Sequence, residues 1–125
     1  MTDVKVADAS ALAAILFGEP AAETMAAEIG EAQLVAPALL AFELANVCLI
    51  KCRRHPEQRE KLLAAYTLRA RFGVREIAVD HAGALELAET AGLTAYDASY
   101  LWLARRLKIP LVTLDKALNR AAQTG

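Results

Sequence analysis

Four carboxylates in this sequence are placed where they can do chemistry together. Asp8, Asp97 and Asp115 each lie beside a predicted helix start, whereas Glu43 lies inside an apolar stretch. Carboxylates that converge in a crevice repel one another and raise each other's proton affinity, and a bound divalent cation relieves that repulsion. Hard oxygen ligands without clustered histidines favour Mg²⁺ or Mn²⁺ over zinc. Such a cation can orient and activate a water for attack on a phosphodiester.

Each aspartate also has an ordinary structural explanation. Asp8 and Asp115 stand where a helix N-cap accepts backbone N–H groups, and Thr94-x-x-Asp97 fits a capping box. Capping explains each of the three when it is taken alone. Their shared placement near one edge of a predicted sheet favours a common site.

Glu43 lies in a helical segment, residues 39–47, with apolar residues on nearly every side. From this pattern we expect no face of that helix to be clearly exposed to solvent. A buried glutamate is costly unless it is paired, hydrogen-bonded or bound to a cation, and Asn46 is placed beside it one turn later. The sequence therefore favours a function for Glu43.

Strands must alternate with helices for these residues to meet. The pattern predicts strands at 4–7, 76–79 and 111–114, and a brief strand or a simple approach to Pro37 at 34–36. Helices are predicted at 10–18, 20–29, 37–54, 56–73, 81–91, 94–107 and 115–123. Short apolar strands are typical of a buried parallel sheet, so we expect a three-layer α/β/α domain with a short, mostly parallel sheet and an inserted helical hairpin at 37–73. Asp8 and Asp115 follow strand ends, where such sheets bind ligands.

The composition limits the number of domains and the possible partners. The chain has 125 residues, 56% of them apolar, which is enough for one domain over 1–125. With 14 basic and 15 acidic residues, the net charge of −1 neither supports nor excludes a nucleic-acid partner. The high apolar content favours a homodimer, and we interpret Tyr96, Tyr100 and Trp102 as core or dimer contacts rather than base-stacking groups.

The cysteines and the chain start indicate a compartment. Cys48 and Cys52 lie four apart on one predicted helix, where we expect free thiols in a reducing environment. Cys48, Cys52 and His55 could together supply three zinc ligands, but a fourth ligand is missing. The first residues lack a signal-peptide pattern, and Glu43 interrupts the longest apolar stretch, so we expect a cytoplasmic protein without a membrane span.

Four segments in register resemble one known family, the PIN-domain proteins of the VapC toxin type, over essentially the whole chain. These segments are Ala7-Asp8-Ala9-Ser10-Ala11-Leu12, Pro37-x5-Glu43-x2-Asn46, Leu93-Thr94-Ala95-Tyr96-Asp97-Ala98-x-Tyr100 and Leu111-Val112-Thr113-Leu114-Asp115. Each is weak as a single pattern, but their order and spacing together are highly specific.

The resemblance implies a Mg²⁺- or Mn²⁺-dependent endoribonuclease, the toxin of a type II toxin–antitoxin pair that cleaves tRNA, messenger RNA or ribosomal RNA. It assigns Asp8, Glu43, Asp97 and Asp115 to the acidic cluster and Ser10, Asn46 and Thr113 to supporting roles. It also implies a homodimer and a VapB-like antitoxin that inserts a basic side chain into the acidic pit. One departure is that family members commonly continue into a final strand, whereas this sequence ends at Gly125.

Two other interpretations remain open. A receiver-type signalling domain also binds magnesium in an acidic pocket, but it needs five regularly alternating strand–helix units and paired acids after the first strand. A catalytically silent binding module would keep the fold and use the pit to hold a partner's arginine. All four acids are present, so the sequence offers no reason for silence.

Overall fold

The computed structural model describes residues 3–124. Residues 1–2 and 125, on which the expectations about the chain start and the chain end partly rest, lie outside this range. In chain order the elements are β1 (Val4–Ala7), α1 (Ala9–Leu16), α2 (Ala22–Ile29), β2 (Gln33–Ala36), α3 (Leu39–Arg54), η1 (Pro56–Gln58), α4 (Arg59–Thr67), η2 (Leu68–Phe72), β3 (Arg75–Glu76), α5 (His81–Ala91), α6 (Ala95–Leu107), β4 (Leu111–Val112) and α7 (Lys116–Gln123).

The described strands form one parallel sheet in the order β3-β2-β1-β4. Val6 of β1 pairs with Val35 on one side and with Leu111 on the other. The chain therefore moves outward in one direction from β1 to β3 and then crosses to β4 on the opposite side of β1. In open parallel sheets such a reversal of strand order leaves a crevice at the carboxyl ends of the strands.

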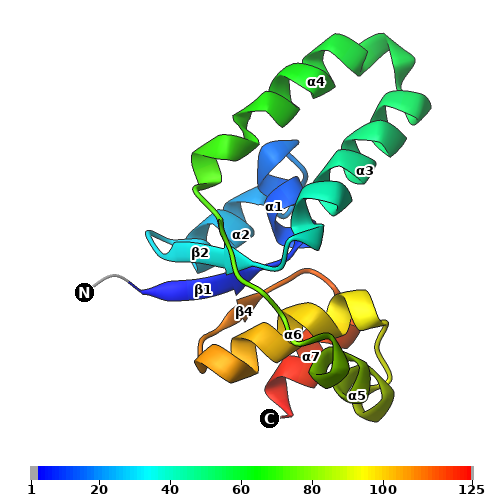
Figure 1. Ribbon diagram of the computed structural model, residues 1–125. Helices are drawn as coiled ribbons and strands as arrows, with labels where there is room; N and C mark the ends of the chain where they lie inside the picture. Colours follow the sequence, from blue (N-terminus) through cyan, green and yellow to red (C-terminus); the bar gives the residue numbers. More distant parts are fainter. Residues whose placement is uncertain (1–2, 125) are drawn as a thin grey trace.

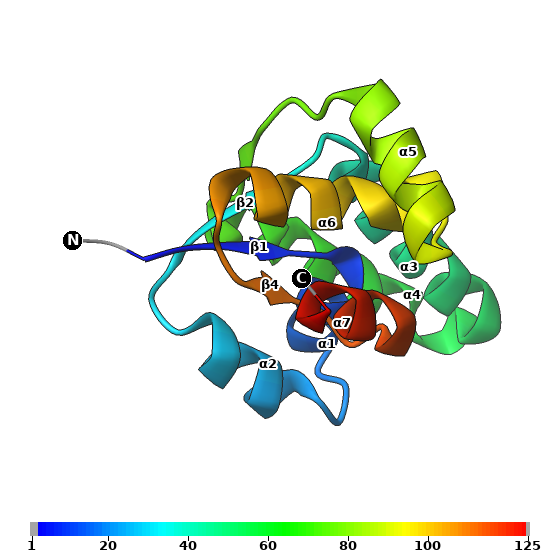
Figure 2. The same cartoon turned by 90° about the horizontal axis from the view of Figure 1, so that it is seen from below.

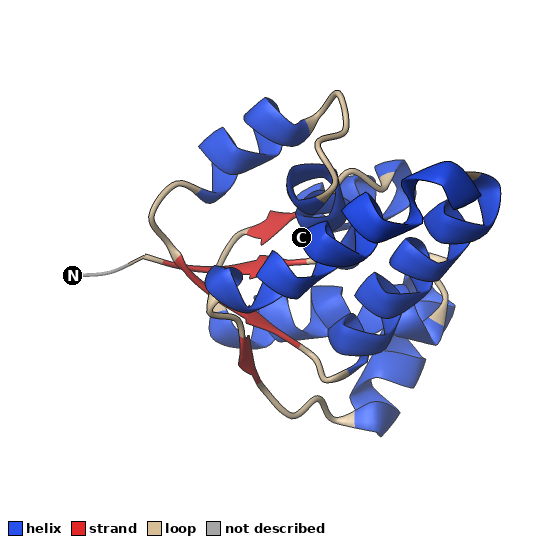
Figure 3. Ribbon diagram, turned by 90° about the horizontal axis from the view of Figure 1, so that it is seen from above, coloured by secondary structure: helices blue, strands red, loops and turns tan. Residues whose placement is uncertain are grey.

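Helices cover the sheet on both sides (Figures 1 and 3). In Figure 1, α1 to α4 lie above the strands and α5 to α7 lie below them, with the α3–α4 hairpin extending away from the sheet. Figure 2 shows α6 running alongside β1 and α7 beside β4. The predicted three-layer α/β/α architecture with an inserted helical hairpin is confirmed.

The core lies between the sheet and its two central helices. Val6 of β1, Leu12 of α1 and Leu101 and Leu103 of α6 are almost completely buried. Burial of a side chain of this size contributes roughly 1.5–3 kcal/mol. Because α1 follows β1 directly and α6 precedes β4, this packing fixes the loops that carry the carboxylates.

Two strands are shorter than predicted. The pairing of β3 ends at Glu76, after which only the Ile77 N–H bonds back to the Ala36 carbonyl, so residues 77–79 form a loop. The β4 pairing ends at Val112 because the chain then turns toward the α7 N-cap. Residues 34–36, which the sequence left open, form most of β2.

The expected burial of the helix around Glu43 is wrong. Only Leu40, Leu44 and Cys48 of α3 are buried, whereas the side chain of Phe42 is 80% exposed. The apolar sequence of α3 does not indicate that only one side of this helix is buried. In the structure, α3 contacts the core and α4 through one narrow face. Cys48 and Cys52 are free thiols, as expected. None of the helices described between residues 3 and 124 combines the length and apolar character that a membrane crossing needs.

Candidate active site

Asp8 begins the site because β1 ends where α1 starts. It is the N-cap of α1, and its Oδ1 accepts hydrogen bonds from the Ala11 amide at 3.1 Å and the Ser10 hydroxyl at 2.7 Å. Its Oδ2 accepts from the Thr113 hydroxyl at 2.5 Å. Asp8 is only 5% exposed, and burial raises its pKa despite these donors, with a smaller contribution from the charge of Asp115.

Two hydroxyl groups join the β1 loop to the β4 loop. Ser10 Oγ accepts from the Leu114 amide at 2.9 Å, and Thr113 Oγ1 accepts from the Asp115 amide at 3.0 Å. The two hydroxyl oxygens lie 3.3 Å apart. The loops before α1 and α7, more than a hundred residues apart in the chain, are thereby held in register.

Asp115 is the N-cap of α7. Its Oδ1 accepts from the Leu118 amide at 2.8 Å, and no described residue donates to Oδ2. The predicted cap is therefore real, and one carboxylate oxygen is left for another partner.

Glu43 reaches the same edge from α3. The buried hydroxyl of Tyr100, on α6, donates to Glu43 Oε1 at 2.5 Å. Partial burial raises the pKa of Glu43; this bond lowers it, and the charges of Asp8 and Asp97 raise it further. Burial also raises the pKa of Tyr100, as do its bond to Glu43 and the nearby carboxylates, so the hydroxyl keeps its proton and remains a donor.

Asp97 lies in the first turn of α6. Its amide donates to the Thr94 hydroxyl at 3.0 Å, which forms the first half of the predicted capping box. The Thr94 side chain also interacts with the Asp97 carboxylate and lowers its pKa, although not enough to offset the causes that raise it. Its pKa is raised chiefly by partial burial and further by the charges of Asp115 and Asp8.

The four carboxylates form one electrostatic cluster. Asp8, Asp97 and Asp115 each contribute to the raised pKa of at least one other member, and Glu43 receives such contributions from Asp8 and Asp97. The ion pairs found within residues 3–124, Lys51–Glu19 and His55–Glu57, do not involve the cluster. Within the same range no three acidic, histidine or cysteine side chains are already gathered as a metal cage. We call this group of four carboxylates, which no described cationic side chain compensates, the acidic pit.

Comparison with known proteins identifies the fold family. The family described as PIN domain matches residues 5–123. This chain belongs to the PIN-domain family. VapC ribonuclease Mb0985 of Mycobacterium bovis and Ribonuclease VapC9 of Mycobacterium tuberculosis are each 39% identical to this PIN domain over 124 residues, covering 94% of this chain and 91% of theirs. The resemblance to VapC-type proteins predicted from the sequence is confirmed.

A solved structure supports the fold of this PIN domain independently. The crystal structure of PAE2754 from Pyrobaculum aerophilum matches it with a TM-score of 0.64 at 22% identity, covering 99% of this chain and 94% of that one. At this identity the match establishes the fold.

In the structure of this PIN domain, the three residues predicted to support the acidic cluster differ in their contacts. Ser10 and Thr113 bond directly to Asp8, whereas Asn46 is exposed and forms no side-chain hydrogen bond with any described residue. Tyr100, which we interpreted as a core or dimer contact, is in the core and also holds Glu43. The sequence contains a signal for the place of Tyr100 in the site: Tyr100 lies three residues after Asp97, and residues three apart share a helix face.

Proposed function

We propose that this chain is a divalent-metal-dependent endoribonuclease. The observation that carries the proposal is the uncompensated acidic pit formed by Asp8, Glu43, Asp97 and Asp115. Burying carboxylates together without a cationic partner costs stability, and such arrangements are concentrated at functional sites. The PIN-domain family and the names of its VapC relatives point to RNA as the substrate.

The donor set fits Mg²⁺ or Mn²⁺ in charge and atom type. Asp97 keeps at least one carboxylate oxygen for a ligand, and Glu43 and Asp115 each keep one oxygen without a donor among the described residues. Asp8 has accepted three bonds and retains a single lone pair on Oδ2. A bound cation would lower the pKa of a water and neutralise charge on the phosphate. Because no three acidic side chains within residues 3–124 are gathered for a metal ion, the oxygens would have to move closer together to hold the cation.

The remaining groups position these oxygens. Thr113 and Ser10 fix the Asp8 carboxylate and tie it to the Asp115 loop. Tyr100 holds one oxygen of Glu43 and leaves the other without a donor among the described residues. Such supporting hydrogen bonds orient metal ligands and affect activity nearly as much as the ligands do.

The wider assignment follows the family. We propose a single PIN domain over 1–125 that acts in the cytoplasm as a homodimeric toxin of a type II toxin–antitoxin module. Its antitoxin would be VapB-like and would place a basic side chain in the acidic pit, where no described cation is present. RNA in the form of tRNA, messenger RNA or ribosomal RNA is the proposed substrate.

Of the alternatives, the receiver-type domain is wrong. Receiver-like doubly wound sheets follow the strand order 2-1-3-4-5, whereas the described sheet here follows β3-β2-β1-β4, and the chain belongs to the PIN-domain family. The catalytically silent binding module would have the same fold as the nuclease, so a cleavage experiment is needed to distinguish the two functions.

The test compares two helix-capping aspartates. Asp115→Asn and Asp80→Asn both retain a capping side chain, because asparagine caps as well as aspartate does. Asp80 caps α5 by accepting from the Gly83 amide and lies outside the acidic pit. Mixed tRNA and messenger RNA would be incubated with each protein in Mg²⁺, Mn²⁺ or EDTA.

We expect cation-dependent cleavage by the wild type and by Asp80→Asn, with a loss of about 100-fold or more in Asp115→Asn and Asp97→Asn and no loss of thermal stability in EDTA. If the folded wild type cuts none of these RNAs in either cation, the silent binding module replaces the nuclease. Equal loss in both capping variants would mean that capping, not the pit, explains the effect.

A further inference from the structure

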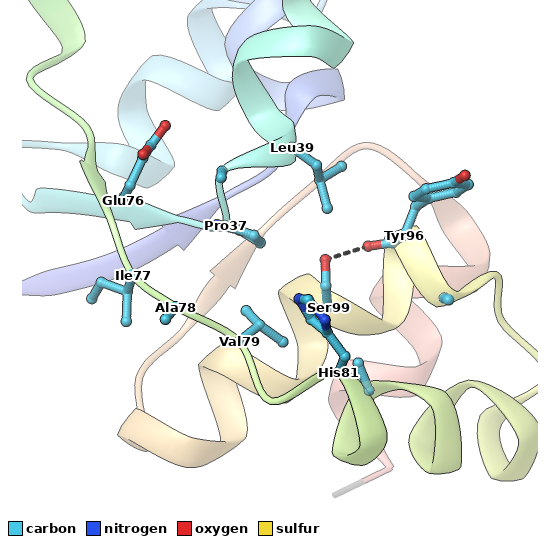
Figure 4. A pocket seen from close by; sticks show the side chains of 12 residues that line it. Pro37, Leu39, Glu76, Ile77, Ala78, Val79, His81, Tyr96 and Ser99 are labelled. Atoms are coloured by element: carbon cyan, nitrogen blue, oxygen red, sulfur yellow. Dashed lines mark hydrogen bonds between the residues drawn. The ribbon is translucent and has the colours of Figure 1, made fainter.

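A mainly apolar cavity of about 630 Å³ opens next to the acidic pit (Figure 4). Its walls come from the start of α3, the loop after β3 and the first turns of α5 and α6. In Figure 4, Pro37 and Leu39 lie at the start of α3, and Ile77 and Val79 lie on the loop after β3. Its size is that of a small-ligand pocket, and none of the four carboxylates lines it.

The cavity and the acidic pit share two helices as walls. On α3, Leu39 lines the cavity and Glu43 enters the pit one turn later on the same side. On α6, Tyr96 and Ser99 line the cavity, while the next residue pair, Asp97 and Tyr100, belongs to the pit. Residues three or four apart on a helix are neighbours at about 5–6 Å. The cavity and the carboxylates are therefore neighbours on both helices.

Among the residues that line the cavity, Tyr96 is the one with a large exposed aromatic ring. Its side chain is 68% exposed, and its ring lies at the outer rim of the cavity, beyond its own carbonyl, which accepts from the Ser99 hydroxyl (Figure 4). Tyr100 is buried against Glu43, and Trp102 is partly buried beside Gly83. A large exposed ring next to Asp97 has no packing role within the described chain.

The lining combines flat apolar walls with a few polar groups. Glu76, His81 and Ser99 stand among the apolar residues, and their side chains provide carboxylate, imidazole and hydroxyl groups. A nucleobase has the matching character, with apolar faces that stack on aromatic rings and a polar edge that hydrogen-bonds.

We propose that this cavity, with Tyr96 at its rim, binds one unpaired nucleobase of the RNA strand whose phosphate reaches the acidic pit. The inference rests on the proposed function and adds the way in which single-stranded RNA is held. Tyr96 is a positioning residue, because it contacts the base and not the reacting phosphate.

The experiment measures RNA affinity separately from cleavage. Binding of a short, labelled, single-stranded oligoribonucleotide of mixed sequence would be followed by fluorescence anisotropy in Mn²⁺ on the Asp97→Asn background, where the strand stays intact. Tyr96→Ala and Tyr96→Phe would be compared with Leu68→Ala, an exposed apolar control on η2. Cleavage constants and molar mass in solution would be measured for the same substitutions in the otherwise wild-type chain.

Removing a stacking ring weakens binding by roughly tenfold, so Tyr96→Ala should lose about that much affinity and raise KM more than it lowers kcat. Tyr96→Phe keeps the ring and should stay within about twofold of its parent, as should Leu68→Ala. RNA binding that depends on Tyr96 in a protein that cuts nothing would support the base site and overturn the nuclease.

Unchanged affinity in Tyr96→Ala would overturn the base site, and wild-type cleavage would still support the nuclease. A fall in molar mass in Tyr96→Ala at unchanged affinity would assign this face to a second copy of the chain and would also overturn the base site.

Discussion

Asp8 shows how one side chain can serve a helix and a site together. Its Oδ1 caps α1, and its Oδ2 accepts from Thr113 on the neighbouring strand connection. Asp115 uses Oδ1 for its cap and keeps Oδ2 free. A carboxylate has about four lone-pair sites, so capping does not exhaust it. Capping and cation binding, which compete as explanations in the sequence, are therefore compatible in the structure.

Removing the Tyr100 hydroxyl tests whether Glu43 must be held in place. Tyr100→Phe deletes the bond to Glu43 Oε1 and leaves the buried ring. We expect a loss of about 1 kcal/mol in the free energy of unfolding and a loss of roughly tenfold in cleavage or Mn²⁺ affinity, the usual effect of losing a supporting hydrogen bond. Chemical denaturation and cation titration would measure both.

Tyr66→Phe is the matched control for that substitution. Tyr66 is partly buried, its ring stacks under the Arg69 guanidinium at 4.0 Å, and its hydroxyl bonds to no described residue. Phenylalanine keeps the ring, so stability and activity should stay near wild type. Equal cation affinity in Tyr100→Phe and the wild type would show that Glu43 needs no positioning.

At the scale of elements, local patterns predicted β1 and the α6 start well. Residues 4–7 form β1 as predicted, and Thr94 caps α6 as its position indicated. The length of β3 could not be predicted, because the apolar residues 77–79 leave the sheet to line a cavity. The Glu43–Tyr100 bond joins residues 57 apart and depends on how α3 meets α6, which no local pattern contains.

The exposure of α3 was hidden for a similar reason. Its sequence is apolar on several sides, yet α1 and α4 cover only one of them, so Phe42 and Leu49 remain exposed. Composition reports how much apolar surface a helix has, whereas its neighbours decide how much of that surface is buried.

The close approach of α5 and α6 predicts an unusual effect at Gly83. Alanine normally stabilises a helix interior by about 0.5–1 kcal/mol relative to glycine. Here an added Cβ would lie 2.5 Å from Trp102 Nε1 and 3.0 Å from Asp80 Oδ2. We expect Gly83→Ala to destabilise the protein by about 1–3 kcal/mol, as overpacking does.

Trp102 fluorescence would follow that change directly, because it is the only tryptophan in the chain. Ala82→Gly, at an exposed neighbouring position of α5, is the control and should cost only the ordinary glycine penalty of about 1 kcal/mol. A more stable Gly83→Ala protein with unchanged fluorescence would mean that the helices can separate freely.

At the scale of the molecule, topology gathers what the sequence separates. The strand order places the ends of β1 and β4 side by side, and the packing of α3 and α6 brings Glu43 and Asp97 to the same edge. Four negative charges thus meet in a chain whose net charge is only −1. The sequence could predict the four residues from their placement, but their shared electrostatic field depends on the fold.

That field predicts how the stability of the whole protein varies with pH. Burial, and secondarily the neighbouring carboxylates, raise the pKa values of Asp8, Glu43 and Asp97 in the folded state. The folded chain therefore holds protons more tightly than the unfolded chain, so the contribution of the pit to stability is greatest below the unfolded pKa values of about 4. It falls as the pH rises through the raised values. In EDTA we expect the melting temperature to fall across this window, and at neutral pH Mn²⁺ at about 100 times its Kd should restore roughly 2.7 kcal/mol.

Thermal unfolding at a series of pH values, with EDTA and with Mn²⁺, would test this. Asp97→Asn removes one charge from the pit and should reduce both the pH-dependent loss and the stabilisation by Mn²⁺, whereas Asp80→Asn, outside the pit, should change neither. If the cation-free protein instead gains stability from about pH 4 to neutral pH, and Asp97→Asn does not alter that gain, the carboxylates are stabilised by partners within the fold. The acidic pit would then have no unmet charge for a cation to neutralise, and the physical basis of the proposed metal site would be lost.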